Sequence, residues 1–204
     1  EKNIKLAEAG DENYFYNIGS AYEFGVGTGK NIAEAVRWYK KAAETNSSSS
    51  QAIYRLGEIY FTGNGVAKDN TAAKQYFLDS YAKGYYYSAS RLFDIYMNEN
   101  NEDAAVLWGK RALDAYDLRV KVRLADLYLN KIKNNNGTHE MVRDAYKYYS
   151  EHSAFLDSDS SEKIEIKSKM EELNKYLAKE EIEEIDKNTE KYKRDMEEGE
   201  SEFE

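Results

Sequence analysis

The chain of 204 residues contains no cysteine, no proline and only two histidines. Without cysteine there is no disulfide framework, no thiolate metal site and no cysteine nucleophile. Without proline, helices can run uninterrupted, which favours an all-helical chain over proline-bounded strands or linkers. His139 and His152 are not spaced as in a zinc-binding helix, so the sequence predicts no metal site and no cofactor.

Long apolar runs and an excess of positive charge are also missing. No run of about 18 apolar residues occurs, so the sequence predicts no direct insertion into a membrane. The net charge is -9, and residues 178–204, with 5 basic and 12 acidic side chains, account for -7 of it. A nearly neutral body with an acidic tail lacks the basic face that nucleic acid requires. We therefore expect no nucleic-acid partner.

What the sequence does contain is an internal repeat. Two segments align at a spacing of 38 residues, pairing Ile18-Gly19 with Leu56-Gly57, Tyr22 with Tyr60, Gly25 and Gly27 with Gly63 and Gly65, and Trp38-Tyr39 with Tyr76-Phe77. A period in this range, with turn glycines between two helical stretches, is typical of stacked helix pairs. Each pair would bury its apolar side against its neighbours.

The apolar spacing predicts where the helices lie. The second copy predicts a helix over residues 51–60 and another over 72–82, with a glycine loop at 63–65 and capping side chains at 69–71 between them. The first copy predicts helices over 13–24 and 32–45. A third copy has Phe93 in place of the small residue after the core leucine and a tight turn at 98–101, and a fourth has an enlarged loop at 131–139.

Both ends of the chain depart from the repeat. Residues 5–10 match the close of a helix, so we expect the first repeat to be truncated and further repeats to precede it. The first residue is Glu1, which indicates a trimmed chain or a mature chain that has lost a leader. After Ser160 a weak amphipathic helix and then a highly charged one are expected. The predicted domains are a repeat array of about four units over residues 1–157 and a C-terminal capping helix with an acidic tail over 158–204.

The strings Ile18-Gly19-x-x-Tyr22-x-x-Gly25-x-Gly27 and Ala35-x-x-Trp38-Tyr39 resemble the Sel-one-like repeat, a relative of the tetratricopeptide repeat. The resemblance implies an all-α, right-handed solenoid of antiparallel helix pairs. The C-terminal capping helix is expected from the polar, charged segment itself, because a terminal repeat needs a polar outer face. It also implies a non-catalytic scaffold or adaptor that binds a protein or peptide partner in a concave groove. Some relatives act in the periplasm, outside the cell or in the endoplasmic reticulum lumen, so the resemblance favours an extracytoplasmic location. It leaves the oligomeric state open.

Two columns of charge appear when the first helices of the repeats are aligned. The position before the core leucine is Asn17, Arg55, Arg91 and Arg123, and the position two after it is Ser20, Glu58, Asp94 and Asp126. We hypothesise that these arginines and acids, flanked by Tyr54 and Phe61, bind a partner that carries charge of both signs. The alternative is an internal arginine–carboxylate ladder, in which each exposed pair contributes roughly a few tenths of a kcal/mol. Both can hold.

The sequence also bears on nucleotide binding and on catalysis. The glycine loop at 25–30 is not a phosphate loop, because Phe24 stands where glycine is needed and Asn31 where serine or threonine is needed. No convergent nucleophile, base and orienting residue can be found, so the sequence predicts that the chain is not an enzyme. A bacterial immunity or inhibitor protein that neutralises a toxin or enzyme remains the alternative within the binding class.

Overall fold

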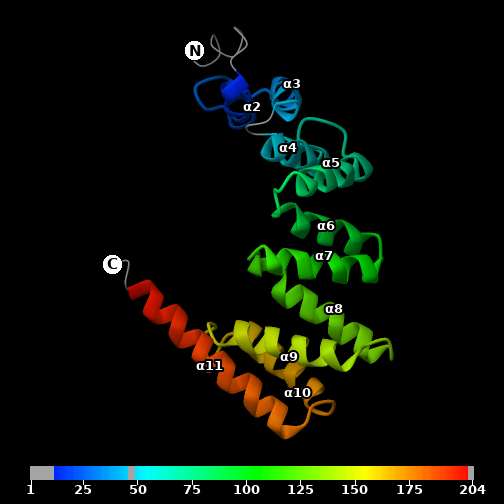
Figure 1. The fold of residues 1–204 in the computed structure, drawn as a ribbon, viewed down its shortest axis with the longest axis vertical. Helices are drawn as coiled ribbons and strands as arrows, with labels where there is room; N and C mark the ends of the chain where they lie inside the picture. Colours follow the sequence, from blue (N-terminus) through cyan, green and yellow to red (C-terminus); the bar gives the residue numbers. More distant parts are fainter. Residues whose placement is uncertain (1–11, 46–48, 202–204) are drawn as a thin grey trace. The chain divides into compact units, whose positions relative to one another are not determined.

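The computed structural model describes residues 12–45 and 49–201, and within these ranges the regular structure is helical, with no strand (Figure 1). Residues 5–10, predicted to close a helix, lie outside the described residues. The chain divides into two compact units, the first ending at Asp117 and the second beginning at Leu118. The boundary predicted from the sequence, between residues 157 and 158, stays a prediction.

Unit 1 consists of three helix pairs. They are α2 (Phe15–Phe24) with α3 (Ile32–Ala43), α4 (Ser49–Thr62) with α5 (Asn70–Ala82), and α6 (Ser88–Asn98) with α7 (Glu102–Asp114), preceded by the short helix η1 (Glu12–Tyr14). The helices of each pair pack on each other, α3 packs on α4, and α5 packs on α6. The helix-pair architecture predicted from the repeat is therefore confirmed.

Local chemistry sets the helix ends. Gly25 and Gly63 stop α2 and α4 with left-handed φ values of 73° and 71°, which glycine adopts without a steric penalty. Asn31 and Asp69 then cap the partner helices, because their side chains accept hydrogen bonds from the backbone N–H of the third residue on. The third pair has no glycine loop, and Asn100, with a φ of 54°, makes its short turn.

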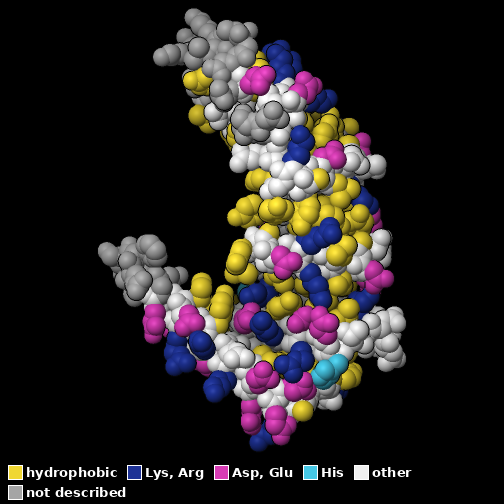
Figure 2. Space-filling model, in the orientation of Figure 1, with side chains coloured by type: hydrophobic (Ala, Val, Ile, Leu, Met, Phe, Trp, Pro, Cys, Tyr) yellow, Lys and Arg dark blue, Asp and Glu magenta, His cyan; other side chains and the backbone are white. Residues whose placement is uncertain are grey.

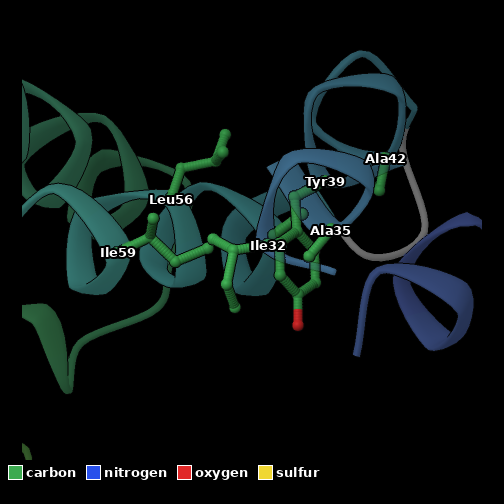
Figure 3. Close-up of a cluster of buried hydrophobic side chains, with 7 residues drawn as sticks. Ile32, Ala35, Tyr39, Ala42, Leu56 and Ile59 are labelled. Atoms are coloured by element: carbon green, nitrogen blue, oxygen red, sulfur yellow. The ribbon is translucent and has the colours of Figure 1, made fainter. Parts of the chain in front are cut away.

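A buried cluster joins the first two pairs (Figure 3). Its members are Ile32, Ala35, Tyr39 and Ala42 from α3 and Ala52, Leu56 and Ile59 from α4, each no more than 9% exposed. These are the small and branched residues that recur at helical spacing in the sequence. Burial of this apolar surface holds consecutive repeats together.

In the first two pairs the helices approach so closely that one of them carries a glycine at the contact. A Cβ built on Gly19 would lie 2.7 Å from the Tyr39 ring, and one built on Gly57 would lie 2.6 Å from the Phe77 ring. In the third pair the sizes are exchanged, because buried Phe93 occupies the glycine position and buried Gly109 occupies the ring position. The exchange keeps one small and one large residue at the two aligned positions.

Unit 2 contains one further pair and two C-terminal helices. η2 (Leu118–Val120) leads into α8 (Lys121–Lys133), which pairs with α9 (His139–Ser153), and α10 (Ser161–Asn174) and α11 (Lys179–Ser201) both pack on α9. The loop between α8 and α9 is shorter than predicted, since residues 131–133 continue α8. Across the described ranges, no helix has the length and apolar composition needed to cross a membrane.

The Gly57 contact predicts an unusual response to alanine. Replacing a glycine inside a helix by alanine normally raises the free energy of unfolding by about 1 kcal/mol. In Gly57→Ala the new Cβ would overlap the Phe77 ring, so we expect the free energy of unfolding to fall by about 1–2 kcal/mol instead. Urea denaturation followed by circular dichroism measures this, with the exposed Gln51→Ala on the same helix as control. A stabilised Gly57→Ala variant would contradict the close contact.

Buried tyrosines predict a two-stage alkaline titration. Burial, and then a hydrogen bond to a carboxylate, raise the pKa values of Tyr39 and Tyr149 above the ordinary 10.0. Burial, and then the nearby Asp186, raise the pKa of Tyr146 to about 12. These groups contribute stability that is fully present below pH 10 and is lost as the pH rises toward their folded values. Ultraviolet titration should show exposed tyrosines ionising first and a later stage coinciding with unfolding, whereas the denatured chain should titrate in one stage.

Candidate functional site

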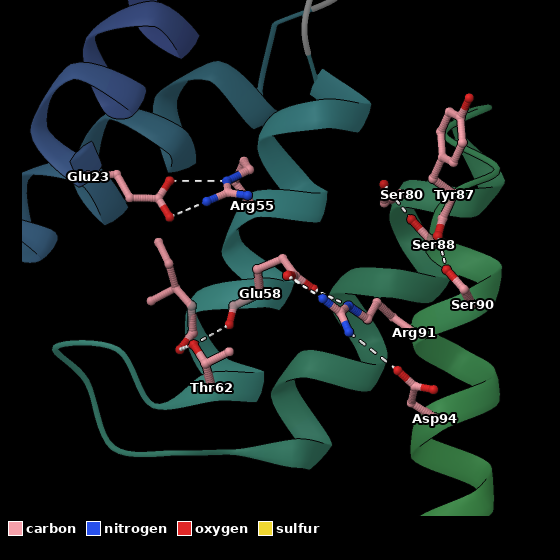
Figure 4. A network of polar contacts seen from close by, with 11 residues as sticks. Glu23, Arg55, Glu58, Thr62, Ser80, Tyr87, Ser88, Ser90, Arg91 and Asp94 are labelled. Carbon is pink, nitrogen blue, oxygen red and sulfur yellow. Dashed lines mark hydrogen bonds and ion pairs between the residues drawn. The ribbon is translucent and has the colours of Figure 1, made fainter. Parts of the chain in front are cut away.

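The first charged contact joins helices of consecutive repeats. Arg55 on α4 reaches back to Glu23 on α2, with its Nε donating to Oε2 at 3.0 Å and its Nη2 pairing with Oε1 (Figure 4). Glu23 is only 4% exposed and also accepts a hydrogen bond of 2.7 Å from the Tyr39 hydroxyl. The carboxylate therefore ties three helices, α2, α3 and α4, at one point.

The same contact recurs one repeat later. Arg91 on α6 donates from Nε to Glu58 Oε1 at 2.7 Å and from Nη2 to Oε2 at 2.9 Å. Its Nη1 also pairs with Asp94, one turn along α6, at 3.3 Å (Figure 4). We call Glu23, Arg55, Glu58, Arg91 and Asp94 the arginine ladder. Bidentate pairs of this kind have stronger hydrogen bonds and a more fixed geometry than single contacts.

The ladder keeps its arginines charged. Burial alone would lower the pKa of Arg55, but the hydrogen bonds and charge of Glu23 raise it above the ordinary arginine value. Glu58 does the same for Arg91 against the effect of burial. A proton-transfer role is therefore excluded for both arginines, which act as fixed cations.

Aromatic rings flank the ladder. The Arg55 guanidinium lies 5.2 Å from the Phe24 ring centroid, and that of Arg91 lies 5.7 Å from the Phe61 ring. Phe24 is 61% exposed. Phe61 packs edge-on against Phe77 with ring centroids 6.2 Å apart, so part of its surface belongs to the repeat core. Cation–π contact holds each guanidinium in place from a second direction.

A tyrosine group lies beside the ladder. Tyr54 packs on Tyr85 and on Phe77, with centroid distances of 4.8 and 5.5 Å, and Tyr85 packs on Tyr87 at 5.7 Å. Tyr87, at the start of α6, is 52% exposed (Figure 4). Figure 2 shows hydrophobic side chains gathered over the α5–α6 part of unit 1. Exposed rings on an otherwise packed surface are typical of interaction sites.

The structure brings most of the sequence-predicted residues together. Arg55, Glu58, Arg91, Asp94, Tyr54 and Phe61 all lie in unit 1, and their contacts are those described above. Asp126 lies in unit 2, where it accepts hydrogen bonds from the Tyr149 hydroxyl at 2.6 Å and from Lys169 at 2.8 Å. Arg123 lies exposed on α8. The continuation of the columns to Arg123 and Asp126, and their role in binding, stay predictions.

Two residues of this surface were missed by the sequence reasoning, namely Glu23 and Phe24. Glu23 does not appear in the aligned columns of charged residues, because Phe61 occupies its position in the next repeat. One signal was available, since Glu23 follows Gly19 by four residues and so lies on the packing stripe of its helix. A carboxylate at such a position requires a buried partner.

The two histidines belong to unit 2. His139 and His152 pair with Glu181 at 3.0 Å and Glu162 at 2.9 Å on the surface of unit 2. Within residues 12–45 and 49–201, no three His, Cys, Asp or Glu side chains are placed to hold a metal ion. The chemistry present is that of paired charges and aromatic surfaces, which suits recognition.

Comparison with known proteins identifies the repeats. The model of the family described as Sel1 repeat matches residues 16–47 and 50–85. A putative sel1-like repeat-containing protein, L18, of Acanthamoeba polyphaga mimivirus is 43% identical over 47 residues, which are 22% of this chain and 8% of that protein. The ERAD-associated E3 ubiquitin-protein ligase component HRD3A of Arabidopsis thaliana is 33% identical over 76 residues, 37% of this chain and 11% of that protein. The chain thus matches about a tenth of the length of these relatives.

Solved structures show the same fold. A Sel1 repeat protein from Oxalobacter formigenes has a TM-score of 0.57 at 23% identity, covering 82% of this chain and 74% of that one. The protective antigen c5321 of uropathogenic Escherichia coli, which displays an SLR fold, has a TM-score of 0.56 at 17% identity, covering 92% and 47%. Sel1 repeats are generally scaffolds for protein–protein interaction. Residues 16–47 and 50–85 therefore match the Sel1 repeat, and the fold of the chain is that of solved proteins built from this repeat.

Proposed function

We propose that the chain is a non-catalytic scaffold that binds a protein or peptide partner on unit 1. The binding surface is the one that carries the arginine ladder, which we call the ladder face. The observation that carries this proposal is the combination of fixed arginines with exposed rings. Arg55 and Arg91 keep 23% and 33% of their side-chain surface exposed although carboxylates hold them in place. Phe24 stands beside Arg55, and Tyr87 belongs to the tyrosine group through its contact with Tyr85. Both have more than half of their surface exposed.

Preorganisation is what makes this surface suitable for binding. Immobilising a long side chain at an interface costs about 0.5–1.5 kcal/mol. The ladder has already fixed the two arginines, and packing has already fixed Tyr54 and Tyr85. Arginine and tyrosine are also the residue types over-represented among binding hot spots.

The ladder changes the role expected for the arginines. Their Nε and Nη2 atoms are occupied by Glu23 and Glu58, so these arginines act first within the protein. The exposed edges of the guanidinium groups and carboxylates are what a partner would meet, and they present both signs of charge side by side. A partner segment with mixed charge and apolar side chains that cover Phe24 and Tyr87 fits this surface.

The relatives support a role in assembly. HRD3A is named as a component of an E3 ubiquitin-protein ligase, so one relative acts as part of a multi-protein complex. For the present chain we propose the same general role, a subunit that holds other proteins. An immunity or inhibitor function would use the same kind of surface and is distinguished by the identity of the partner.

Substitution of the exposed rings tests the binding face without breaking the ladder. Affinity capture from source-cell extract should retain a partner on the wild-type chain and lose it on Phe24→Ser/Tyr87→Ser. The matched control, Leu107→Ser/Tyr116→Ser, removes two other exposed apolar side chains of unit 1 and should retain the partner. Loss by both variants, or by neither, would argue against the ladder face. Mass spectrometry of the retained protein identifies it as an assembly subunit or as a toxin.

The ladder itself should contribute to stability. Arg55→Ala leaves the buried Glu23 carboxylate without its cation, so we expect the free energy of unfolding to fall by about 2 kcal/mol. Arg37→Ala breaks the exposed pair with Glu34 and should change stability by no more than about 0.5 kcal/mol. Adding Glu23→Gln to Arg55→Ala removes the buried charge and should recover part of the loss. Equal effects of the two arginine substitutions in chemical denaturation would contradict this interpretation.

A further inference from the structure

The last two helices of unit 2 do not continue the repeat. In every other pair the second helix packs on the first, but within the described residues α10 and α11 do not pack as a pair. Instead α11 packs on α9. The contacts advance in the same direction along both helices, from His139 with Glu181 to Phe155 with Tyr192, so α11 lies parallel to α9. Figure 1 shows α11 lying obliquely beside α9.

The contact between α9 and α11 is mainly polar. Arg143 donates from Nη1 to Glu181 at 2.6 Å and pairs with Glu184 at 3.4 Å. The hydrogen bonds of Glu181 with Ala178, His139 and Arg143 lower its pKa to about 2, so the carboxylate stays charged at neutral pH. Arg143 of α9 therefore meets two carboxylates of α11 by charge complementarity.

Toward the C-terminal end of α9, hydroxyl and aromatic groups make the contacts with α11. The Ser150 hydroxyl donates to Asp186 at 3.2 Å and lies within hydrogen-bond distance, 3.1 Å, of the Thr189 hydroxyl. Tyr192 stands edge-on to Phe155 with centroids 6.0 Å apart. Over residues 179–198 of α11, the buried side chains are Ile185 and Thr189, at 6% and 5% exposed. A helix with so few buried apolar side chains is held by complementarity more than by hydrophobic burial.

The packing is also open. A cleft of about 430 Å³ lies between α9 and α11, lined by Arg143, Lys147 and Glu151 on one side and Glu184, Asn188 and Thr189 on the other. A second cleft of about 300 Å³ lies further along, between Ser150 and Ser153 of α9 and Asp186 and Glu190 of α11. Close-packed interfaces have few voids of this size. The short segment Lys175–Ala178 is the link between α10 and α11.

We propose that the α9 surface under α11 is a docking site for an acidic amphipathic helix of a partner protein, and that α11 occupies it until such a helix displaces it. The chemistry of the occupant follows from the contacts of α11. It carries carboxylates one turn apart that face Arg143 and His139, then an apolar residue, a hydroxyl and an aromatic ring at successive turns. This site lies on unit 2 and is separate from the ladder face, so either proposal can fail without the other.

Occupancy by α11 lowers the apparent affinity for a partner helix. The apparent dissociation constant is the intrinsic one divided by the fraction of molecules in which the site is open. Detaching α11 should therefore increase binding without changing the site itself. This distinguishes a displaceable helix from a permanent cap.

The test uses the full chain and a labelled synthetic peptide with the sequence of residues 179–201. Glu181→Arg/Glu184→Arg reverses the charges that face Arg143, and we expect it to raise the peptide affinity about tenfold or more over wild type. The matched control, Glu180→Arg/Glu183→Arg, makes the same charge change at two exposed positions of α11 and should bind as wild type does. Adding Arg143→Glu to Glu181→Arg/Glu184→Arg lets the new arginines of α11 pair with a glutamate on α9. This triple variant should therefore lose the increase in peptide affinity.

A second readout follows displacement in a chain with α11 otherwise intact. The native chain has no cysteine, so Thr189→Cys introduces a single thiol at a buried position of α11. Excess unlabelled peptide should accelerate modification of this thiol. Unchanged affinity in the charge-reversed variant together with unchanged thiol reactivity would overturn the proposal. A concentration-dependent dimer that exchanges α11 would also overturn it, because the occupant would then be a second copy.

Discussion

The close approach of the two helices within each pair is the constraint on which the rest of unit 1 depends. Glycine opposite a ring, at Gly19 with Tyr39 and Gly57 with Phe77, lets the backbones come together. The third repeat shows that the requirement is one small and one large residue, since Phe93 and Gly109 exchange these roles. The constraint is therefore on the summed volume at the contact.

The polar contacts follow from that packing. In the first pair the ring is a tyrosine, and its hydroxyl is satisfied by Glu23, which in turn holds Arg55. In the second pair the ring is Phe77, which needs no acceptor, and the residue at the position of Glu23 is Phe61, packed against it. A buried carboxylate is tolerated only where donors surround it. The hydroxyl of Tyr39 and the guanidinium of Arg55 provide those donors.

The sequence was sufficient for the helix pairs and insufficient for their polar partners. Glycine loops, capping residues such as Asp69 and the apolar stripe act over a few residues, so their effect can be predicted locally. The contact of Arg55 with Glu23 joins residues in different repeats and depends on how closely the helices stack. The sequence predicted a highly charged C-terminal helix, but periodicity alone did not show that this helix packs on α9 and not on α10.

The two proposed surfaces use charge differently, and this follows from how each charge is paired. On the ladder face, cations and carboxylates alternate within a few ångströms, so their fields largely cancel beyond a Debye length and attraction to a partner arises on contact. On α9, the basic side chains face a helix from the acidic end of the chain, where residues 178–204 account for -7 of the net charge. If α11 detached, the charged side chains of α9 would lose the opposite charges that face them. The α9 surface would then attract an oppositely charged partner at a distance. A partner of the ladder face would therefore be selected by shape and rings, whereas a partner of the α9 surface would be selected by charge.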